Sequence, residues 1–381
     1  MLFSEVISDH QIVNMSLKVL VISNYDDNYN AVRPEGELFI GLHHAGVEVE
    51  VMTFGHAAYV KRFEEEGIKV IPFHPTKKYQ AEAVQKIREV LTEGKHDIMH
   101  LFNNPAIVNG IRAARNLPVK VVAYRGYAGN IHWWNPLSYR TFLNPRIDKI
   151  TCLADSVYEQ LGAQWTLPKH KLIVVNKGHQ LKWYDGIEPL DVRKEFDLPE
   201  NAFVYTCVAN NRRMKGIPYL LEATNYFPKD APIYILLIGR NMDTPRNLRI
   251  IKGTPFEKKV IFTGFRKDAM NIVAGNDASV LSSIFGEAIP KSLIESMALG
   301  RPCVATSISG NRGLAVDKKS ALVVPPRQSK PLAEAMLRYW QEPELRKQMG
   351  TQARAHIGNY FNTERSVREM KKVYEDLLKN T

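Results

Sequence analysis

SSIFGEAIPKSLIESMALGRPCVATSISGNRG, residues 282–313, is the stretch of the chain that best indicates its fold. It follows the short apolar run 278–281, whose length and composition predict a buried strand. Pro290 and Gly300 are typical of the first turn and the end of a helix, so residues 290–299 are expected to be helical. The apolar run 302–306 then predicts a second strand. A strand, a helix and another strand form the repeating unit of a parallel sheet covered by helices.

The same alternation extends over the whole chain on both sides of this stretch. In the first half, the predicted strands are 18–24, 48–54, 69–73, 97–102, 119–124, 149–153 and 172–176. In the second half they are 203–208, 233–239, 260–263, 278–281, 302–306 and 321–324. Helical spacing separates many of them, at 37–45, 80–91, 155–161, 218–224 and 267–274. We therefore expect an α/β protein with doubly wound parallel sheets.

A polar segment divides this alternation into two halves. Residues 180–201 are polar and contain Pro189 and Pro199, which is typical of a linker. Two sheets of this kind bind ligands at the carboxyl ends of their strands, so the expected site is a cleft between two facing domains. Near the end of the chain, residues 364–378 place apolar side chains on one stripe, which predicts an amphipathic helix.

The composition excludes several classes of protein. Hydrophobic residues make up 45% and charged residues 24% of the 381 positions, which argues against a disordered chain. No apolar run approaches the ~20 residues of a membrane-spanning helix. Glu5 and Asp9 lie where an export signal would be apolar, and the three widely spaced cysteines predict neither a disulfide framework nor a zinc site. A cytoplasmic protein is the expected result.

Positive charge is concentrated in the second half of the chain. The 51 basic and 40 acidic residues give a net charge of +11. Residues 1–185 contain 21 basic and 19 acidic residues, whereas residues 186–381 contain 30 and 21. Such a surplus suits a phosphorylated small molecule, an anionic membrane face or a polyanion, although most single cations are expected to be solvated. No motif of clustered basic and aromatic residues is apparent, so nucleic acid is not an expected partner.

Two glutamates in 282–313 are candidates for binding a sugar joined to a phosphate. Glu287 lies in the loop after the predicted strand, and Glu295 lies about one and a half turns into the helix. The amino end of a helix offers free N–H groups and a positive dipole end, which together form an anion site. Carboxylates accept hydrogen bonds from hydroxyl pairs, so this arrangement suits a sugar joined to a phosphate. The alternative is that both glutamates are solvated acids without a ligand.

Glu287-x7-Glu295, the following Ser296-Met297-Ala298-x-Gly300-x-Pro302 and the run from Val304 to Gly310 resemble the donor-site signature of retaining family 4 glycosyltransferases with the GT-B fold. The resemblance covers most of the chain, because Asn176-Lys177-Gly178, Lys215-Gly216 and Gly239 also match the family. It implies two Rossmann-like domains facing an interdomain cleft. Residues 1–185 would form the acceptor domain and 186–358 the nucleotide-sugar donor domain, with a C-terminal helix at 359–381 packing back on the N-terminal domain.

The resemblance also implies roles for individual donor-site residues. Glu295 would hold the ribose hydroxyls of the nucleotide, Glu287 would contact the transferred sugar, and Lys215 would neutralise the diphosphate. Backbone groups near the sugar and diphosphate would come from Gly286, Ala288, Ile289 and Pro290, with Gly239 at the end of a neighbouring strand. The family has Gly-Arg where this chain has Ala209-Asn210, so Arg212 is expected to supply the missing positive charge; a solvated loop arginine is the alternative.

The acceptor side of the expected cleft departs from the family pattern. Pro34-Glu35-Gly36-Glu37 replaces the usual Gly-Gly loop, and Gly36 is the residue expected near the phosphates or the acceptor. Arg125-Gly126 stands where a His-Gly is often found. The aromatic segment 124–145, which contains His132, has three possible interpretations: an acceptor-binding loop, a loop packed by its own side chains, or a patch on a membrane surface.

The expected function is therefore retaining transfer of a sugar from a nucleotide-diphosphate sugar to a saccharide or lipid-linked acceptor, in envelope polysaccharide or lipopolysaccharide synthesis. No histidine or acid cluster has metal-ligand spacing, so neither a metal nor a cofactor is expected. Weak association with an anionic membrane would follow from the basic second half and a lipid-linked acceptor. The alternatives are a GT-B epimerase or phosphorylase and, from another class, a basic nucleic-acid-binding protein.

Overall fold

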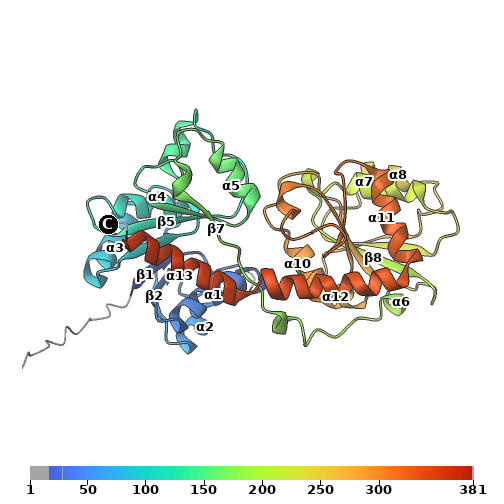
Figure 1. The fold of residues 1–381 in the computed structure, drawn as a ribbon, viewed down its shortest axis with the longest axis horizontal. Coiled ribbons are helices and arrows are strands. Elements are labelled where there is room, and N and C mark those ends of the chain that lie inside the picture. Colours follow the sequence, from blue (N-terminus) through green and yellow to red (C-terminus); the bar gives the residue numbers. More distant parts are fainter. Residues whose placement is uncertain (1–16, 28, 380–381) are drawn as a thin grey trace, which may run out of the picture.

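The computed structural model describes residues 17–27 and 29–379, which form two parallel β-sheets with helices on both faces (Figure 1). The first sheet has the strand order β3-β2-β1-β4-β5-β6-β7. Its strands are β1 Lys18–Ile22, β2 Glu48–Thr53, β3 Lys69–Pro72, β4 Ile98–Leu101, β5 Lys120–Arg125, β6 Lys149–Cys152 and β7 Leu172–Val174. Every strand pair in it is parallel, as the alternation in the sequence predicts.

The second sheet has the order β10-β9-β8-β11-β12-β13, again with parallel pairs throughout. Its strands are β8 Phe203–Val208, β9 Ile233–Ile238, β10 Val260–Gly264, β11 Ala278–Leu281, β12 Cys303–Thr306 and β13 Leu322–Val324. The order places β8 and β11 side by side, with Thr206 opposite Ser279. The loops that follow these two strands therefore leave the sheet as neighbours.

The helices connect the strands and cover both sheets. They are α1 Tyr29–His44, α2 Val60–Glu65, α3 Ala81–Gly94, α4 Asn104–Ala113, α5 Asp155–Gly162, α6 Val192–Glu195, α7 Ile217–Ala223, α8 Pro245–Ile251, α9 Ala269–Gly275, α10 Lys291–Ala298, α11 Ser329–Gln341, α12 Pro343–Tyr360 and α13 Thr363–Lys379. The expectation of a loop at Pro34–Glu37 was wrong, because α1 begins eight residues before 37 and contains Pro34. Pro34 is the sixth residue of α1, where proline cannot donate the helical hydrogen bond to residue 30, so other contacts must hold the helix together.

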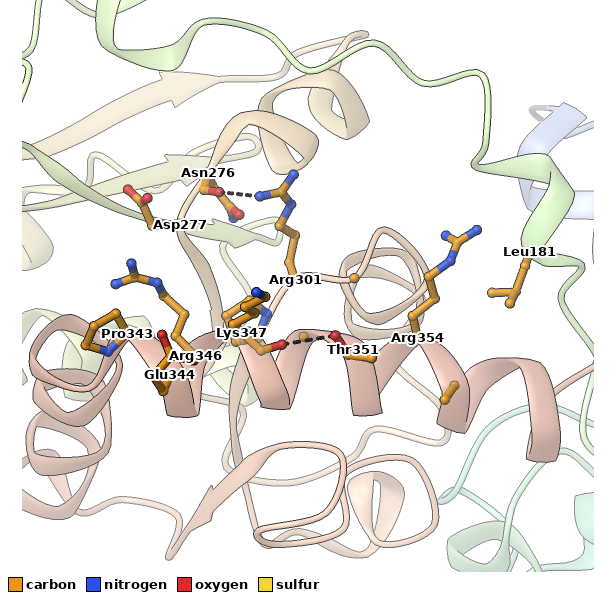
Figure 2. A pocket seen from close by; sticks show the side chains of 14 residues that line it. Leu181, Asn276, Asp277, Arg301, Pro343, Glu344, Arg346, Lys347, Thr351 and Arg354 are labelled. Atoms are coloured by element: carbon orange, nitrogen blue, oxygen red, sulfur yellow. Dashed lines mark hydrogen bonds between the residues drawn. The ribbon is translucent and has the colours of Figure 1, made fainter.

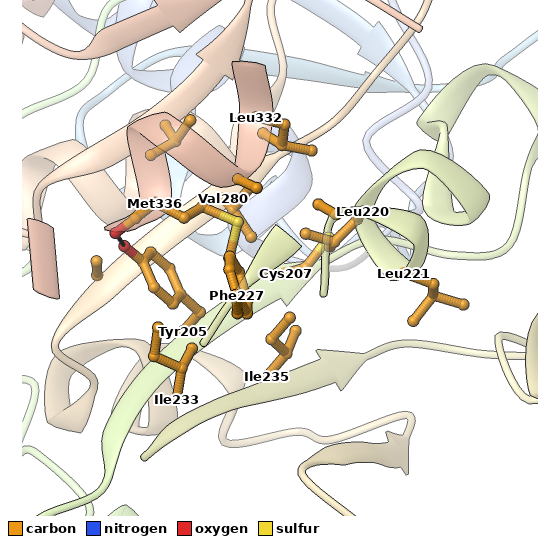
Figure 3. Close-up of a cluster of buried hydrophobic side chains, with 14 of the residues drawn as sticks. Tyr205, Cys207, Leu220, Leu221, Phe227, Ile233, Ile235, Val280, Leu332 and Met336 are labelled. Carbon is orange, nitrogen blue, oxygen red and sulfur yellow. Dashed lines mark hydrogen bonds between the residues drawn. The ribbon is translucent and has the colours of Figure 1, made fainter. Parts of the chain in front are cut away.

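Each sheet has its own apolar core. In the second domain, Tyr205 and Ile235 on the strands pack against α7 and α11, through Leu220 and Met336 (Figure 3). The Tyr205 hydroxyl donates to the backbone oxygen of Met336 over 2.5 Å, which satisfies a polar group at the centre of this core. A well-packed core of this kind holds the strand ends, and hence the loops that leave them, in fixed positions.

The last two helices belong to different domains. Helix α12 lies along the second domain, whereas α13 returns to the first and lies beside α1 (Figure 1). Val367, Met370 and Tyr374 of α13 are buried in the same core as Phe39 of α1. Tyr374 also forms a buried hydrogen bond with the Nδ1 atom of His100, at 2.7 Å.

The chain crosses between the domains at two adjacent points. The backbone N–H of His179 donates to the oxygen of Phe361 at 2.6 Å. A Cβ atom added to Gly178 would lie 2.3 Å from the backbone oxygen of Asn362, so only glycine fits where the two segments pass.

No helix within 17–27 and 29–379 is long and apolar enough to cross a membrane. Residues 1–16, in which an export signal was not expected, lie outside the described residues.

Candidate active site

Two loops meet at the carboxyl ends of β8 and β11. The backbone N–H of Ile284 donates to the oxygen of Met214 at 2.7 Å, and the Ser282 hydroxyl donates to the oxygen of Lys215 at 3.0 Å. Gly216 has a φ of +64°, and a Cβ atom there would lie 2.1 Å from the oxygen of Ser282. A glycine is required at this position because any side chain would push the loops apart.

The loop contact joins two of the predicted catalytic residues directly. The Nζ atom of Lys215 lies 2.5 Å from Oε1 of Glu287, and the Ser283 hydroxyl donates to the same oxygen at 2.7 Å. Both charged side chains are largely buried, with exposed fractions of 15% for Lys215 and 9% for Glu287. The sequence assigned these residues to different parts of a ligand, whereas the structure pairs them with each other. An ammonium has three N–H donors, so Lys215 retains donors for a second acceptor besides the one directed at Glu287.

The Glu287 loop is also where the two domains touch. The Ser156 hydroxyl of α5 donates to the oxygen of Glu287 at 3.4 Å, and Ala288 packs into the apolar core of the first domain. Nearby, the Arg312 guanidinium lies 2.8 Å from the Glu159 carboxylate across the same boundary. Gly310 lies beneath the loop, since a Cβ atom there would be 2.0 Å from the oxygen of Glu287. The predicted donor loop is therefore held by contacts from both domains.

The remaining predicted residues of this loop lead into α10. Gly286 has a φ of +75°, and Met214 packs against it. Ile289 packs partly into the core of the second domain, and Pro290 is the last residue before α10 begins at Lys291. Proline is well suited to this position, where a missing N–H costs no helical hydrogen bond.

Glu295 lines a narrow pocket between α10, the linker and α1. The pocket is bordered by Arg33 of α1, Tyr184 of the linker, and Lys291, whose Nζ lies 3.4 Å from a Glu295 oxygen. Burial raises the pKa of Glu295 above its ordinary value, and the Lys291 ammonium opposes this rise. Glu287 does not border this pocket. The structure thus places the two glutamates in neighbouring but separate surroundings.

Gly239 lies at the end of β9, beside a third set of candidate groups. Its φ is +147°, and a Cβ atom would lie 1.8 Å from the backbone oxygen of Ala209. Residues after β8, β9 and β10 form a pocket of about 390 Å³ here, in which the Arg240 guanidinium lies 5.0 Å from the ring centre of Phe265. Arg212, expected to supply a positive charge, is exposed on the loop after β8.

The candidate residues of the first domain pack mainly within that domain. The ring of Tyr59 covers Gly36, with the nearest ring atom 2.2 Å from the position of an added Cβ. Arg125 donates to the oxygen of Gly129 at 2.5 Å, and burial lowers the pKa of its guanidinium. Gly126 lies against Tyr124. The ring of His132 stacks on that of Trp134, with 5.0 Å between the ring centres. For Arg125 and His132, these contacts match a loop packed by its own side chains.

Family models match both halves of the chain. The model described as Glycosyltransferase Family 4 matches residues 36–182, and the model described as Glycosyl transferases group 1 matches 190–356. A glycosyltransferase from Rickettsia africae superposes with a TM-score of 0.79 at 19% identity, over 96% of this chain and 100% of that one. The chain is a GT-B glycosyltransferase. HepE from Anabaena, in complex with UDP and glucose, has the same fold, with a TM-score of 0.75, 17% identity and coverage of 94% and 100%.

Curated relatives of this glycosyltransferase share a somewhat higher sequence identity with it than these two structures do. It is 24% identical over 309 residues to the UDP-Gal:alpha-D-GlcNAc-diphosphoundecaprenol alpha-1,3-galactosyltransferase of Escherichia coli, covering 77% of this chain and 78% of that protein. It is 22% identical over 218 residues to the N-acetyl-alpha-D-glucosaminyl L-malate synthase of Bacillus anthracis, where the match spans 55% of this chain and 57% of the relative.

Sequence reasoning missed a second buried ion pair in the glycosyltransferase. The Nζ atom of Lys177, just after β7, lies 2.5 Å from a carboxylate oxygen of Glu35 in α1, and the Ser23 hydroxyl donates to the other oxygen at 2.5 Å. Burial alone would lower the pKa of Lys177, but the Glu35 carboxylate outweighs it and the pKa lies above its ordinary value. The motif Asn176-Lys177-Gly178 marked the position of the lysine, but nothing in the sequence marked its partner.

A further pocket of the glycosyltransferase lies away from these residues. It measures about 790 Å³ and opens at the amino ends of β11 and β12, beside α12 (Figure 2). Arg301 donates to the oxygen of Asn276 at 2.9 Å, and Arg354 pairs with Asp185 at 2.5 Å. Two of its cations are thus engaged by the protein. Among the described residues, no group of three or more His, Cys, Asp or Glu side chains is placed to hold a metal ion.

Proposed function

We propose that this glycosyltransferase moves a sugar from a nucleotide-diphosphate sugar to a saccharide or lipid-linked acceptor. The observation that carries the proposal is the Lys215–Glu287 pair, because it places a buried cation beside a carboxylate at the edge of the interdomain boundary. Breaking a glycosyl–phosphate bond builds negative charge on the departing diphosphate. A preorganised ammonium stabilises this charge, and the amino end of α10 adds the positive end of its dipole.

Each of the paired residues has a distinct part in the proposed reaction. Before the donor binds, Glu287 holds the Lys215 ammonium in position, and Ser283 fixes the carboxylate. The diphosphate of the donor then competes with Glu287 for this ammonium. The carboxylate that is released accepts a hydrogen bond from a hydroxyl of the transferred sugar, while Glu295 accepts hydrogen bonds from the ribose.

We propose that the transfer retains the anomeric configuration and requires no metal. An inverting transfer needs a general base on the face opposite to the departing phosphate. Glu287 and Glu295 are assigned to sugar and ribose, and His132 is stacked on Trp134. In a same-face transfer the departing phosphate itself accepts the proton of the acceptor hydroxyl, so no such base is required. Lys215 and α10 supply the positive charge that a metal would otherwise provide.

The names of the relatives favour the cell envelope as the place of action. They include the E. coli galactosyltransferase described above, an O-antigen biosynthesis glycosyltransferase from E. coli and a putative teichuronic acid biosynthesis glycosyltransferase from Bacillus subtilis. HepE was crystallised with UDP and with UDP-glucose, so UDP-sugars are the first donors to test. We propose cytoplasmic synthesis of an envelope glycan, with weak attachment of the basic second domain to anionic membranes.

A donor screen followed by product analysis tests the proposed function. UDP-, GDP- and ADP-sugars are screened by thermal shift, since a ligand at about 100 times its dissociation constant adds roughly 2.7 kcal/mol of stability. Glu295→Ala should reduce the shift, whereas Glu188→Ala, which replaces an exposed glutamate in the linker, should not change it. No shift with any nucleotide sugar would contradict the proposal.

Products are then analysed with and without a saccharide acceptor. Turnover of the nucleotide sugar to its epimer without an acceptor would indicate an epimerase, and dependence on inorganic phosphate would indicate a phosphorylase. Pelleting with anionic but not with neutral vesicles, lost at high salt, is the result expected for the membrane attachment. Equal pelleting with both kinds of vesicle would contradict it.

A further inference from the structure

A second basic pocket lies on the outer surface of the first domain. It measures about 470 Å³ and is formed by the second half of α4, the loop before α3 and the segment leading to β6. Four guanidiniums border it, from Arg112, Arg115, Arg140 and Arg146, and none of its described lining residues is an aspartate or a glutamate. A hollow bordered by cations without a carboxylate has the electrostatic character of an anion site.

Tyr79 is in contact with two of these cations. The guanidinium carbon of Arg112 lies 4.5 Å from the centre of the Tyr79 ring, and that of Arg140 lies 5.6 Å from it. Arg140 also donates to the Tyr79 hydroxyl at 3.0 Å. Cation–π contacts at exposed sites contribute only about 0.5–1 kcal/mol each, while the two like charges repel. An anion bound between them would replace this repulsion with attraction.

Arg146, the fourth arginine of the pocket, differs from Arg112 and Arg140 because it has a structural role. Arg146 pairs with Asp148 at 2.9 Å and donates to the backbone oxygens of Ala114 and Leu117 at 3.3 and 3.2 Å. Its charge is neutralised and it forms a fixed wall of the pocket. The larger pocket in Figure 2 also has carboxylates close to its cations, because Asp277 and Glu344 line it.

We propose that the pocket around Tyr79 binds a phosphate group, at a site separate from the donor cleft. Guanidiniums match phosphate oxygens with two parallel hydrogen bonds, and Arg112 and Arg140 present two of them beside a phenol donor. The pocket borders the segment before the amino end of β6, whereas the donor loops leave the carboxyl ends of β8 and β11. Substrate at the donor site therefore cannot be the occupant.

The rim of the pocket suggests which phosphates can reach it. Tyr139 lines the pocket, and its hydroxyl donates to the oxygen of Trp133 at 2.8 Å. Beyond it lie exposed apolar side chains: Trp133 is 45% exposed, Trp134 64%, Leu137 60% and Trp165 74%. Indoles favour the interface of a bilayer, so these side chains would allow a lipid headgroup to bring its phosphate to the pocket. A soluble phosphate presents the same chemical group to the site.

The test compares binding of inorganic pyrophosphate and of vesicles by matched variants. Calorimetric titrations with pyrophosphate use a Lys215→Ala background, which removes the donor-site cation that would bind the same probe. Arg112→Ala/Arg140→Ala in this background should weaken binding at least about tenfold, because hydrogen bonds between charged groups are lost. Lys347→Ala, which removes a cation from the pocket in Figure 2, is the control and should leave binding unchanged.

A second arm measures binding to vesicles of phosphatidylglycerol and phosphatidylcholine by sedimentation. Loss in the double arginine variant with pyrophosphate alone assigns the site to a soluble phosphate, and loss with vesicles alone assigns it to a lipid headgroup. Both Arg112 and Arg140 are exposed, and Arg112→Lys/Arg140→Lys, which keeps the charge, should fall between the wild type and the alanine variant. Unchanged binding in both arms, or an equal loss of pyrophosphate binding in Lys347→Ala, would overturn the proposal.

Discussion

Replacing Lys215 with methionine should lower both stability and turnover. At 2.5 Å from Glu287, the ammonium is attracted by about 7 kcal/mol at an effective dielectric constant of 20, most of which offsets the desolvation of the two charges. Removing the cation leaves a carboxylate that is only 9% exposed without its counterion. Breaking a buried pair in this way lowers the free energy of unfolding by about 3–5 kcal/mol. The Ser283 hydroxyl still donates to the Glu287 carboxylate in Lys215→Met, so the loss should lie near the lower limit of this range.

A double-mutant cycle separates this effect from a general loss of packing. Urea unfolding is measured for the wild type, Lys215→Met, Glu287→Gln and the double variant, with exposed Lys229→Met as the control. The two losses should not add, because the neutral amide of Glu287→Gln needs no cation. With saturating donor, kcat of Lys215→Met should fall by roughly two orders of magnitude. Additive stability losses together with an unchanged kcat would refute the pairing and its role.

Three further predictions concern the nucleotide, the domain crossing and the product. Glu295→Ala should weaken nucleotide binding by about 1.5–3 kcal/mol in calorimetry. Protonation of the Glu295 carboxylate removes an acceptor, so nucleotide binding should be lost as the pH falls through the raised pKa of Glu295. Lys291→Ala should raise this pKa further and move the loss to higher pH. An unshifted pH profile would show that Lys291 does not act on Glu295. Gly178→Ala should lower the melting temperature, since its Cβ would meet the Asn362 oxygen, whereas Gly186→Ala, with open space around it, should not; equal melting temperatures would contradict the tight crossing. Proton NMR of the product from an α-linked donor should show an α linkage at full rate in chelator, and a β linkage would overturn the same-face mechanism.

The sheets could be predicted from the sequence because their strands are short apolar runs between turn signals. The runs 203–208 and 278–281 coincide with β8 and β11. Helix bounds were harder to predict. The family pattern indicated a loop at residues 34–37, yet packing of Phe39 and Leu42 in the core holds α1 together around Pro34. Tertiary packing outweighs local preference at such positions.

The contacts within the site could not be predicted in the same way. Lys215 and Glu287 were both singled out, but 72 positions separate them and their pairing depends on β8 lying next to β11. The order of strands in a sheet is set by the packing of the complete domain, which leaves no local trace in the sequence. The same holds for Glu35, whose partner Lys177 is 142 positions away.

The return of α13 to the first domain has a consequence for how the protein is made. The ribosome synthesises α13 only after the whole second domain, yet Met370 and Tyr374 of α13 complete the core of the first. Until then the imidazole of His100, which bonds to Tyr374 across 274 positions, lacks this partner. The amino-terminal domain therefore cannot reach its final packing until the second domain and α13 have been synthesised. The apolar face of the first domain that α13 covers stays exposed on the nascent chain. Chaperones that bind such faces should engage this protein until α13 docks.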